Sequence, residues 1–398
     1  MGFKTYTCPI AKACGGCEWL AVPYPIQLRR KQKEVEKLFS AAAERDHATI
    51  EPIRGMEDPR AFRNKAATPF APGKGGRIRS GFFAAGSHRI VRCDSCLVED
   101  PRARDILNDV ARVAERLGIR AYQEDRGRGT LRHAIVRCGY ATEDILLTLV
   151  TNGQWLPRER EFVAELTQRH PEISSIAQNI NQRRTNAMLG RECKTLFGSG
   201  IMHDKLLGCT FEISPTSFYQ TNPRQTEVLY QLSIDACQQA AVSGEGNFNV
   251  LDAYCGTGTI GMCIAKQDGS VHVTGVEQVH DAVDCAKRNA RANSLDQRAR
   301  FVAADATEYM NSIAESGKAS FDVVVMDPPR AGSTPQFLDG VTHMGTKTVV
   351  YVSCNPKTQL RDIEHLQRRG YRLRTLTPVD MFPHTKHIET VALLTKRG

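Results

Sequence analysis

The sequence lacks any long hydrophobic segment. No run of apolar residues approaches eighteen, and the first ten residues, MGFKTYTCPI, contain no apolar core. A membrane-spanning helix needs about 20 such residues, and a secretory signal needs an apolar segment of roughly 7 to 15. We therefore expect a cytoplasmic protein with no membrane partner.

The repeats, low-complexity tracts and depleted apolar content that mark repetitive or disordered chains are also missing. Hydrophobic residues make up 41% of the 398 residues and charged residues 24%, which is ordinary for a globular protein. A chain of this length is expected to form two or three domains with at least one sizeable core.

Acidic residues are fewer than basic ones. The chain has 44 Asp and Glu against 53 Lys and Arg, which gives a formal net charge of +9 and a pI near 8.9. Excess positive charge favours a polyanionic partner such as nucleic acid, although a solvated basic surface without that role explains it equally well.

Cysteine, by contrast, is abundant, with 13 residues. Disulfides rarely persist in the cytoplasm, so some of these thiols are expected to bind a metal or do chemistry. Cys8, Cys14 and Cys17 form a C-x5-C-x2-C motif, and Cys93 and Cys96 follow far along the chain. Four thiolates suit either zinc or a [4Fe-4S] cluster, and the spacing leaves both open. Five other cysteines lie in periodic apolar patterns and are interpreted as small buried hydrophobes: Cys138, Cys209, Cys237, Cys263 and Cys285.

The last part of the chain, residues 213–398, alternates strand and helix patterns. Seven strand-like segments, from NVLDAYCGTGT to HIETVALLTKR, are separated up to the fifth by helix-length amphipathic stretches. This alternation predicts a doubly wound α/β domain with a mostly parallel sheet. The last two strands are joined only by PHTK, so we expect them to pair antiparallel at one side of the sheet. Seven strands with that ending indicate a methyltransferase sheet.

Three segments precede this domain. Residues 1–21 contain the first cysteine motif, and residues 22–53 contain one amphipathic helix at 25–46. Residues 54–212 mix short strand patterns and helices with basic, glycine-rich loops, which predicts an α+β domain.

A glycine-rich turn follows the first strand of the C-terminal domain. In LDAYCGTGTIG, Gly256 and Gly258 let the backbone approach a ligand, and Glu277 ends the next strand, where a carboxylate can bind ribose hydroxyls. This pattern alone leaves both a nicotinamide cofactor and S-adenosylmethionine open. The fourth strand favours the second, because it ends in DPPR, where Asp327 precedes two prolines that hold a rigid open turn over the pocket.

Cys354 ends the fifth strand, in VVYVSCNPKT. Doubly wound sheets bind ligands at the carboxyl ends of their strands, and a thiol there can act as a nucleophile. A buried structural cysteine is the ordinary interpretation of a strand cysteine, but the position of SCNP beside DPPR favours catalysis.

Taken together, these residues resemble the RNA uracil-C5 methyltransferases, which form 5-methyluridine in ribosomal or transfer RNA. The resemblance spans nearly the whole chain, and the combination of SCNP with FPHTKHIE is highly specific. The other matching segments are CGGC, FRNK at 62–65, SGFFAAGSHRIV at 80–91, LRHAIVR at 131–137, SFYQTN at 217–222, DAYCGTGT and DPPR. The family implies a Rossmann-like seven-stranded sheet in a catalytic domain at 213–398, a central RNA-binding domain at 54–212, and packing of 22–53 on the catalytic domain.

The cysteine-bearing branch of the family carries a [4Fe-4S] cluster. By position Cys8, Cys14 and Cys17 match three of its ligands, and Cys96 best matches the fourth, with Cys93 as the alternative. Many relatives begin with a small β-barrel domain, whereas this chain begins at its cysteine motif. In this it resembles the branch that acts on 23S ribosomal RNA, with transfer RNA as the alternative target. We expect a monomer.

The resemblance also implies the roles of the site residues. Cys354 adds to C6 of uracil, because C5 is too weak a nucleophile unaided, and Glu389 removes the C5 proton. The residues expected to bind S-adenosylmethionine are Gln220, Tyr254, Gly256, Gly258, Glu277 and Asp327. The flipped base is expected to contact Phe62, Arg63 and Phe218, and His384 and His387 are left between a structural and a catalytic role.

Two other classes of protein compete with this interpretation. A nicotinamide-dependent oxidoreductase with an iron-sulfur relay fits the glycine turn and the cysteines, but it leaves SCNP and HIE unexplained. A non-enzymatic RNA-binding module fits the charge but not a complete cofactor pocket.

Overall fold

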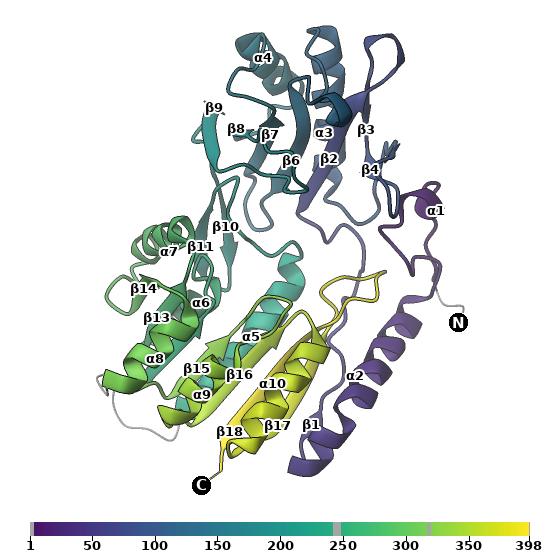
Figure 1. Ribbon diagram of the computed structural model, residues 1–398. Helices are drawn as coiled ribbons and strands as arrows, with labels where there is room; N and C mark the ends of the chain where they lie inside the picture. The colour runs from purple at the N-terminus through teal and green to yellow at the C-terminus, as the bar shows by residue number, and fades with distance from the viewer. Residues whose placement is uncertain (1–3, 242–247, 317–319, 398) are drawn as a thin grey trace.

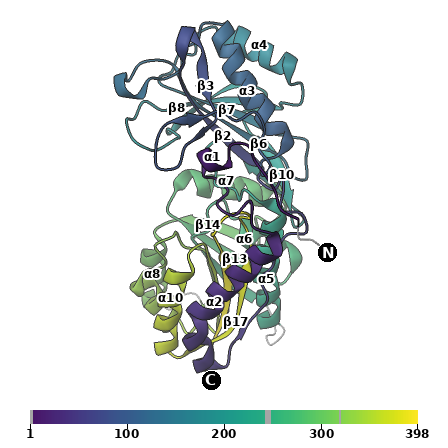
Figure 2. The ribbon, with the colours of Figure 1, turned by 90° about the vertical axis from the view of Figure 1, so that its right-hand side faces the viewer.

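The computed structural model describes residues 4–241, 248–316 and 320–397, which form two units stacked one above the other (Figure 1). The larger unit is built on the sheet of the C-terminal domain, and the smaller unit contains the central part of the chain. The N-terminal segment contacts both: α1 (Ala11–Cys14) lies beside the small unit and α2 (Tyr24–Asp46) lies along the large one (Figure 2).

The large unit contains a mixed sheet of eight strands in the order β1-β17-β18-β16-β15-β12-β13-β14. β18 lies between β16 and β17 and is antiparallel to both, as the short connection predicted. The strands are β1 (Thr49–Ile50), β12 (Phe248–Ala253), β13 (Val271–Glu277), β14 (Ala299–Ala303), β15 (Val323–Met326), β16 (Thr348–Ser353), β17 (Tyr371–Val379) and β18 (Glu389–Lys396).

The expected number of seven strands is wrong by one. β1 pairs in parallel with the edge strand β17, with Thr49 opposite Thr375, and the amide of Glu51 donates to the carbonyl of Leu376 at 2.9 Å. A strand of two residues has no periodicity that the sequence could reveal. It covers backbone groups of β17 that would otherwise be exposed at the edge of the sheet.

Helices cover both faces of this sheet. Along β16, Val350 and Val352 point into a core shared with α5, α6 and α7, whereas Val349 and Tyr351 point into a second core with α8, α9 and α10. Because alternate side chains of a strand face opposite sides, a strand buried on both faces is apolar throughout. The helices are α5 (Pro223–Ala241), α6 (Thr259–Gln267), α7 (His280–Ala292), α8 (Ala306–Ser316), α9 (Pro335–His343) and α10 (Pro356–Arg368).

α2 packs on the large unit although it precedes the central domain in sequence. Its Val35 and Phe39 are fully buried in the second core, where the helix contacts α10 and β17. At its end, Asp46 accepts hydrogen bonds from the side chain of Gln367 at 2.6 Å and from the amide of Leu373 at 2.8 Å. Neither α2 nor any other helix in the described ranges is long and apolar enough to cross a membrane.

The small unit is a six-stranded sheet in the order β3-β2-β6-β7-β8-β9, with α3 and α4 packed on one face. That face presents Ala66, Val136 and Leu147, and the opposite face of β2 turns toward the large unit. The elements are β2 (Lys65–Pro72), β3 (Ile78–Ser80), α3 (Pro101–Arg116), β6 (Leu131–Cys138), β7 (Ile145–Thr151), α4 (Glu159–Arg169), β8 (Ser175–Ile180) and β9 (Glu192–Phe197), with a hairpin of β4 (Phe82–Phe83) and β5 (Ile90–Val91) and short 3-10 turns η1 (Lys74–Gly76) and η2 (Glu124–Arg126).

A hairpin of β10 (Met202–Leu206) and β11 (Cys209–Ile213) connects the two units. Its Phe211 lies in the core of the large unit, and the amide of Thr210 donates to the side chain of Asn293, just after α7, at 2.8 Å. A boundary at residue 213 therefore separates segments that pack together, and we place the start of the large unit before β10.

Candidate active site

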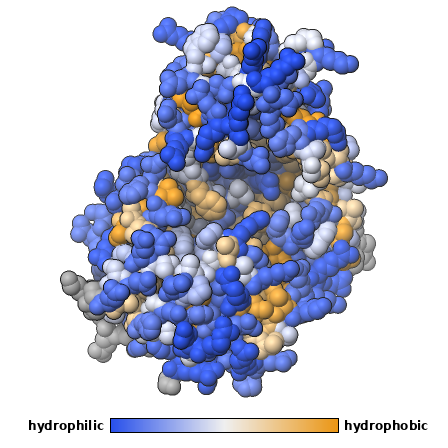
Figure 3. Space-filling view, viewed as in Figure 1, coloured by the Kyte–Doolittle hydropathy of each residue, from blue (hydrophilic) through white to orange (hydrophobic). Residues whose placement is uncertain are grey.

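A cavity of about 1110 Å³ lies between the two units. It is visible as the hollow in the middle of Figure 3, with hydrophilic residues predominating on the small unit above it. Its floor is formed at the carboxyl ends of β12, β13, β15 and β16, and its roof includes Arg63, Lys65 and Phe82 of the small unit. Ligands bind at this edge in doubly wound sheets.

Cys354 and Glu389 meet in this cavity because of the register between β16 and β18. The antiparallel ladder pairs Thr348 with Thr395 and ends with Ser353 opposite Thr390, so the next pair along is Cys354 and Glu389. Both side chains line the cavity. A thiol from a parallel strand and a carboxylate from an inserted antiparallel strand are thus neighbours across the sheet.

The environment of Glu389 disfavours ionisation of its carboxyl group. Burial first, and then the charge of Asp327, raise the pKa of Glu389 to about 8, while Arg330 opposes the shift. Burial also raises the pKa of Cys354, assisted by Glu389 and Asp327 and again opposed by Arg330. The thiol and the two carboxyl groups are therefore coupled in their titration, beside the fixed charge of one guanidinium group.

Hydrogen bonds connect the turns that carry these groups. The carbonyl of Arg330, in the DPPR turn, accepts from the side-chain amide of Asn355 at 2.9 Å and from the hydroxyl of Thr358 at 3.2 Å. The hydroxyl of Ser353 accepts from the amide of Asn355 at 3.1 Å. These contacts join the end of β15 to the start of α10 and fix the position of the thiol between them.

The glycine-rich turn forms the other end of the cavity. Tyr254 has a φ of 63°, which is rare for a bulky residue, and its hydroxyl lies 2.9 Å from that of Ser333. The carboxylate of Glu277 accepts from the amides of Gly256 at 3.2 Å and Val279 at 2.9 Å. Apart from Gly256 and the residues next to it in the chain, no described atom lies within 4 Å of where a Cβ on Gly256 would be, so the turn is open to a ligand.

Acidic groups gather beneath this turn. Burial, with a smaller effect of Asp327 and Glu277, raises the pKa of Asp252 to about 7, although its carboxylate accepts from the amide of Gly261 at 2.9 Å. Burial raises the pKa of Asp327 to about 7 as well. Three carboxyl groups at neighbouring strand ends favour a ligand that brings positive charge.

Most of the residues expected at the site do line this cavity. They are Arg63, Phe218, Gln220, Tyr254, Gly256, Glu277, Asp327, Cys354 and Glu389. Gly258 does not line it: the residue has a φ of 77°, precedes α6 and lies against the ring of Phe301, where a Cβ would come within 2.5 Å. Phe62, expected to contact the base, is instead buried in a small core with Tyr24 and Met56.

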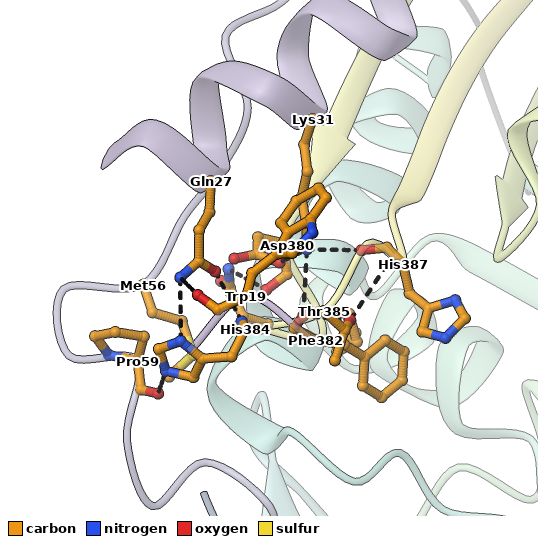
Figure 4. A network of polar contacts seen from close by, with 12 residues as sticks. Trp19, Gln27, Lys31, Met56, Pro59, Asp380, Phe382, His384, Thr385 and His387 are labelled. Atoms are coloured by element: carbon orange, nitrogen blue, oxygen red, sulfur yellow. Dashed lines mark hydrogen bonds and ion pairs between the residues drawn. The ribbon is translucent and has the colours of Figure 1, made fainter. Parts of the chain in front are cut away.

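α2 holds the loop between β17 and β18 (Figure 4). Lys31 is fully buried and donates to the carboxylate of Asp380 at 2.5 Å and to the carbonyls of Phe382 at 3.2 Å and His387 at 2.8 Å. The hydroxyl of Tyr24 donates to the other carboxylate oxygen at 2.7 Å. This buried ion pair, with its remaining polar atoms hydrogen-bonded, fixes the loop that leads into β18.

His384 has a structural position in the same loop. It is fully buried, its amide donates to the side chain of Gln27 at 2.9 Å, and its ring nitrogen lies 2.9 Å from the carbonyl of Pro59. His387 is exposed, and Figure 4 shows its ring pointing away from the network. Neither histidine is among the residues that line the cavity.

Comparisons with known proteins agree with this architecture. Residues 203–397 match the family model described as tRNA (uracil-5-)-methyltransferase. An uncharacterized RNA methyltransferase of Halalkalibacterium halodurans is 40% identical over 387 residues, which cover 97% of this chain and 82% of that protein. An uncharacterized RNA methyltransferase of Staphylococcus aureus is 39% identical over 386 residues, which cover 97% of this chain and 83% of that protein. The Pyrococcus abyssi tRNA (uracil-54, C5)-methyltransferase, solved with S-adenosyl-L-homocysteine, has a TM-score of 0.77 and 26% identity, covering 98% of this chain and 87% of that one.

The chain belongs to the RNA (uracil-5-)-methyltransferase family. Its fold is that of the S-adenosylmethionine-dependent methyltransferases, and it is an enzyme. The nicotinamide-dependent oxidoreductase and the non-enzymatic RNA-binding module, both considered from the sequence, are thereby set aside.

The four cysteines expected to hold the cluster lie in one region; they are Cys8, Cys14, Cys17 and Cys96. Burial first, and then the nearby thiols of Cys96, Cys14 and Cys8, raise the pKa of Cys17 to about 12. Cys93 lies close by, but its thiol donates to the carbonyl of Ser95 at 3.2 Å. In the described part of the chain, however, no three His, Cys, Asp or Glu side chains are close enough to hold a metal ion. The iron-sulfur motif is therefore not shown by this geometry.

Sequence reasoning missed two cationic residues of the cavity. Arg330 ends the DPPR motif, and its charge acts on both Cys354 and Glu389. Lys65 ends the FRNK motif and lines the cavity together with Arg63. The available signal was the spacing of two positions between Arg63 and Lys65 in a segment that leads into β2.

The raised pKa of Glu389 predicts a pH-dependent stability difference. The folded pKa is about 8, against 4.5 for an ordinary glutamate, so the protonated carboxyl group stabilises the fold fully below pH 4.5, and this contribution is lost as the pH rises through 8. Glu389→Gln removes that titration. We expect the variant to match wild type near pH 4.5 and to exceed its unfolding free energy by on the order of 4 kcal/mol at pH 9, measured by urea denaturation.

The exposed Glu308 on α8 provides the control, because Glu308→Gln should change stability by less than about 0.5 kcal/mol at either pH. A stability difference for Glu389→Gln that does not vary with pH would contradict the buried, protonated carboxyl group.

Removing the charge of Lys31 should destabilise the large unit strongly. Lys31→Met leaves Asp380 buried without a cation, which costs about 3 to 5 kcal/mol, and should lower the urea midpoint. Lys37→Met, at an exposed position of the same helix, should change it little. The double variant Lys31→Met, Asp380→Asn should recover much of the loss. A single Lys31→Met variant as stable as wild type would show that the pair does not anchor the loop.

Proposed function

We propose that this enzyme methylates C5 of a uridine in ribosomal RNA through a covalent bond between Cys354 and C6. The observation that carries the proposal is the position of the thiol beside the carboxyl group of Glu389 at the junction of β16 and β18. The reaction needs a nucleophile at C6 and a base at C5, two adjacent ring atoms, and the ladder presents both groups to one cavity.

The other end of the cavity fits S-adenosylmethionine, which supplies the methyl group as a sulfonium cation. The carboxylate of Glu277 is held by two backbone amides in an orientation that can accept ribose hydroxyls, and Gly256 leaves the turn open. The carboxyl groups of Asp252, Glu277 and Asp327 favour a cation over a neutral ligand. The same charges no longer attract the cofactor sulfur once the methyl group has left, because the sulfur is then a neutral thioether.

The steps follow from the chemistry of uracil. The Cys354 thiolate forms a bond to C6, and the electrons of the C5–C6 double bond move toward the C4 carbonyl, giving an enolate. C5 then takes the methyl group, and the pair of the broken carbon–sulfur bond stays on the cofactor sulfur. The Glu389 carboxylate removes the C5 proton, the C5–C6 double bond re-forms, and the thiolate leaves with its electron pair.

The shifted pKa values suit these roles. A carboxyl group with a pKa of about 8 is a stronger base than an ordinary glutamate once it is ionised. When Glu389 is protonated it no longer raises the pKa of Cys354, so the thiolate forms more readily, and Arg330 favours it further. The same carboxyl group therefore favours the attack while it is protonated and, after losing its proton to solvent, can act as the base for product release.

Ribosomal RNA is the first candidate substrate, by the resemblance to the branch that acts on 23S RNA. Transfer RNA is the second, favoured by the substrate in the name of the structurally similar P. abyssi enzyme. The target base must leave its stack to reach Cys354, which suits a single-stranded or loop uridine. Mapping 5-methyluridine in both RNAs from a deletion strain distinguishes the two.

Trapping experiments test the covalent mechanism. RNA that carries 5-fluorouridine at the target should form a denaturation-resistant adduct with wild type, because fluorine cannot leave as a proton does. Cys354→Ala should form none, whereas the exposed-thiol control Cys193→Ala should form as much as wild type.

On ordinary RNA, Glu389→Gln should accumulate an adduct that contains the methyl label, since the amide cannot take the C5 proton. An adduct with Cys354→Ala would refute the nucleophile, and free methylated RNA at the wild-type rate with Glu389→Gln would refute the base.

We further propose that Cys8, Cys14, Cys17 and Cys96 hold a [4Fe-4S] cluster, with Cys93 outside the ligand set. The support is the gathering of the four thiols, which would need to draw closer to reach ligand distances. The cluster supplies no step of the reaction. Protein purified without oxygen should be brown and contain about four iron atoms per chain, and Cys17→Ser should lose the colour whereas Cys93→Ser keeps it. Colourless protein with stoichiometric zinc would overturn the iron assignment.

A further inference from the structure

Two cationic side chains are paired across the sheet above the cavity. Lys65 begins β2, and Arg137 lies directly opposite it on β6 in the antiparallel ladder. Residues opposite each other in such a ladder face the same side, with Cβ atoms about 5 Å apart. Arg63, two residues before Lys65, lines the same cavity, and it also lies near Cys17. This face is the one turned away from α3 and α4, toward the large unit.

The pair has no counter-charge. In the described part of the chain, the ammonium group of Lys65 has neither a hydrogen bond nor an ion pair. Arg137 is only 5% exposed, donates to the carbonyl of Ser217 at 2.7 Å, and leaves its buried Nε without a partner. The acidic residue of the cavity on this side, Glu99, is bound at 2.6 Å by Arg104 and is not available.

Like charges in a half-buried place are costly to the free protein. Burial first, and then the charges of Arg137 and Arg63, lower the pKa of Lys65 to about 8. Burial lowers the pKa of Arg137 to about 10. An anion bound at Lys65, the member of the pair that lines the cavity, would offset the repulsion and give the ammonium group a partner, so the arrangement suits a bound anion better than an empty site.

The rest of the cavity indicates which anion this is. The floor is acidic, with Glu277, Asp327 and Glu389, whereas the roof is cationic. A nucleotide whose uracil reaches Cys354 would direct its uncharged base toward the floor and its phosphate toward the roof. Phe218, 69% exposed at the cavity, provides an aromatic surface on which a neighbouring base can stack.

We propose that Lys65 and Arg137 form a phosphate subsite that binds the RNA backbone beside the flipped uridine. Lys65 contacts the phosphate, and Arg137 supports it from behind while holding the carbonyl of Ser217, next to Phe218. This inference rests on the proposed function, since it takes the ligand of the cavity to be an RNA strand. The subsite reads the backbone and not the sequence, so it positions the target nucleotide for any RNA that the enzyme accepts.

Salt-dependent binding of a fluorescent single-stranded oligouridylate, without S-adenosylmethionine, tests the subsite. Loss of one phosphate contact should reduce the slope of log K against log salt by about 0.7 and weaken binding roughly tenfold at low salt. We expect this for Lys65→Gln, whereas Lys65→Arg should keep the wild-type slope. Lys37→Gln makes the same charge change at an exposed position on α2, which is not among the residues that line the cavity, and should bind as wild type.

Two further measurements make the result decisive. The affinity for S-adenosylmethionine, measured without RNA, should be unchanged in Lys65→Gln, and the melting temperature should equal or exceed that of wild type, because an unpaired cation has been removed. Lys65→Gln with the wild-type salt slope would overturn the proposal. So would weakened S-adenosylmethionine binding with unchanged oligouridylate binding, which would assign the subsite to the carboxylate of the cofactor.

Different results would overturn the phosphate subsite and the proposed function. If wild type methylates no RNA but binds oligouridylate with a slope that depends on Lys65, the phosphate subsite stands and the uridine methylation does not. If wild type forms 5-methyluridine and Lys65→Gln binds and methylates as wild type does, the function stands and the subsite is overturned.

Discussion

The pairing of β18 with β16 determines which groups meet at the carboxyl edge of the large sheet. An antiparallel strand inserted beside a parallel one begins where its neighbour ends, so Glu389 opens β18 beside the thiol of Cys354, just past the end of β16. A shift of one residue would turn the carboxyl group to the other face of the sheet. The buried pair of Lys31 and Asp380 fixes the loop that leads into β18, so this register depends on α2, a helix from the far end of the sequence.

The cavity combines two electrostatic environments. Its floor holds carboxyl groups whose burial raises their pKa values, which favours a sulfonium ligand and provides a strong base in Glu389. Its roof presents Lys65, backed by Arg137, while the carboxylate of Glu99 on this side is already paired with Arg104. A polyanion whose bases are uncharged fits this division, because it can place phosphate above and base below. The two-unit architecture is what allows opposite charges to line one cavity without neutralising each other.

Much of this could be predicted from the sequence. Alternating strand and helix patterns predicted the doubly wound sheet and its antiparallel ending, and because strand ends converge in such sheets, Cys354 and Asp327 could be assigned to one pocket. β1 could not be predicted, since two residues carry no periodicity. The pairing of Lys65 with Arg137 also depends on a register between strands far apart in sequence, which no local pattern specifies. The burial of Phe62 follows from packing against α2 and is equally invisible in the sequence.

The fate of the hydrogen at C5 tests the central claim most directly. RNA with tritium at C5 of its uridines is incubated with the enzyme and S-adenosylmethionine that carries a carbon-labelled methyl group. Tritium should appear in water in equal amount to the methyl groups transferred, and both signals should vanish with Cys354→Ala. Transfer of methyl groups while the tritium stays in the RNA would contradict the account, because the methyl group would then lie on an atom other than C5.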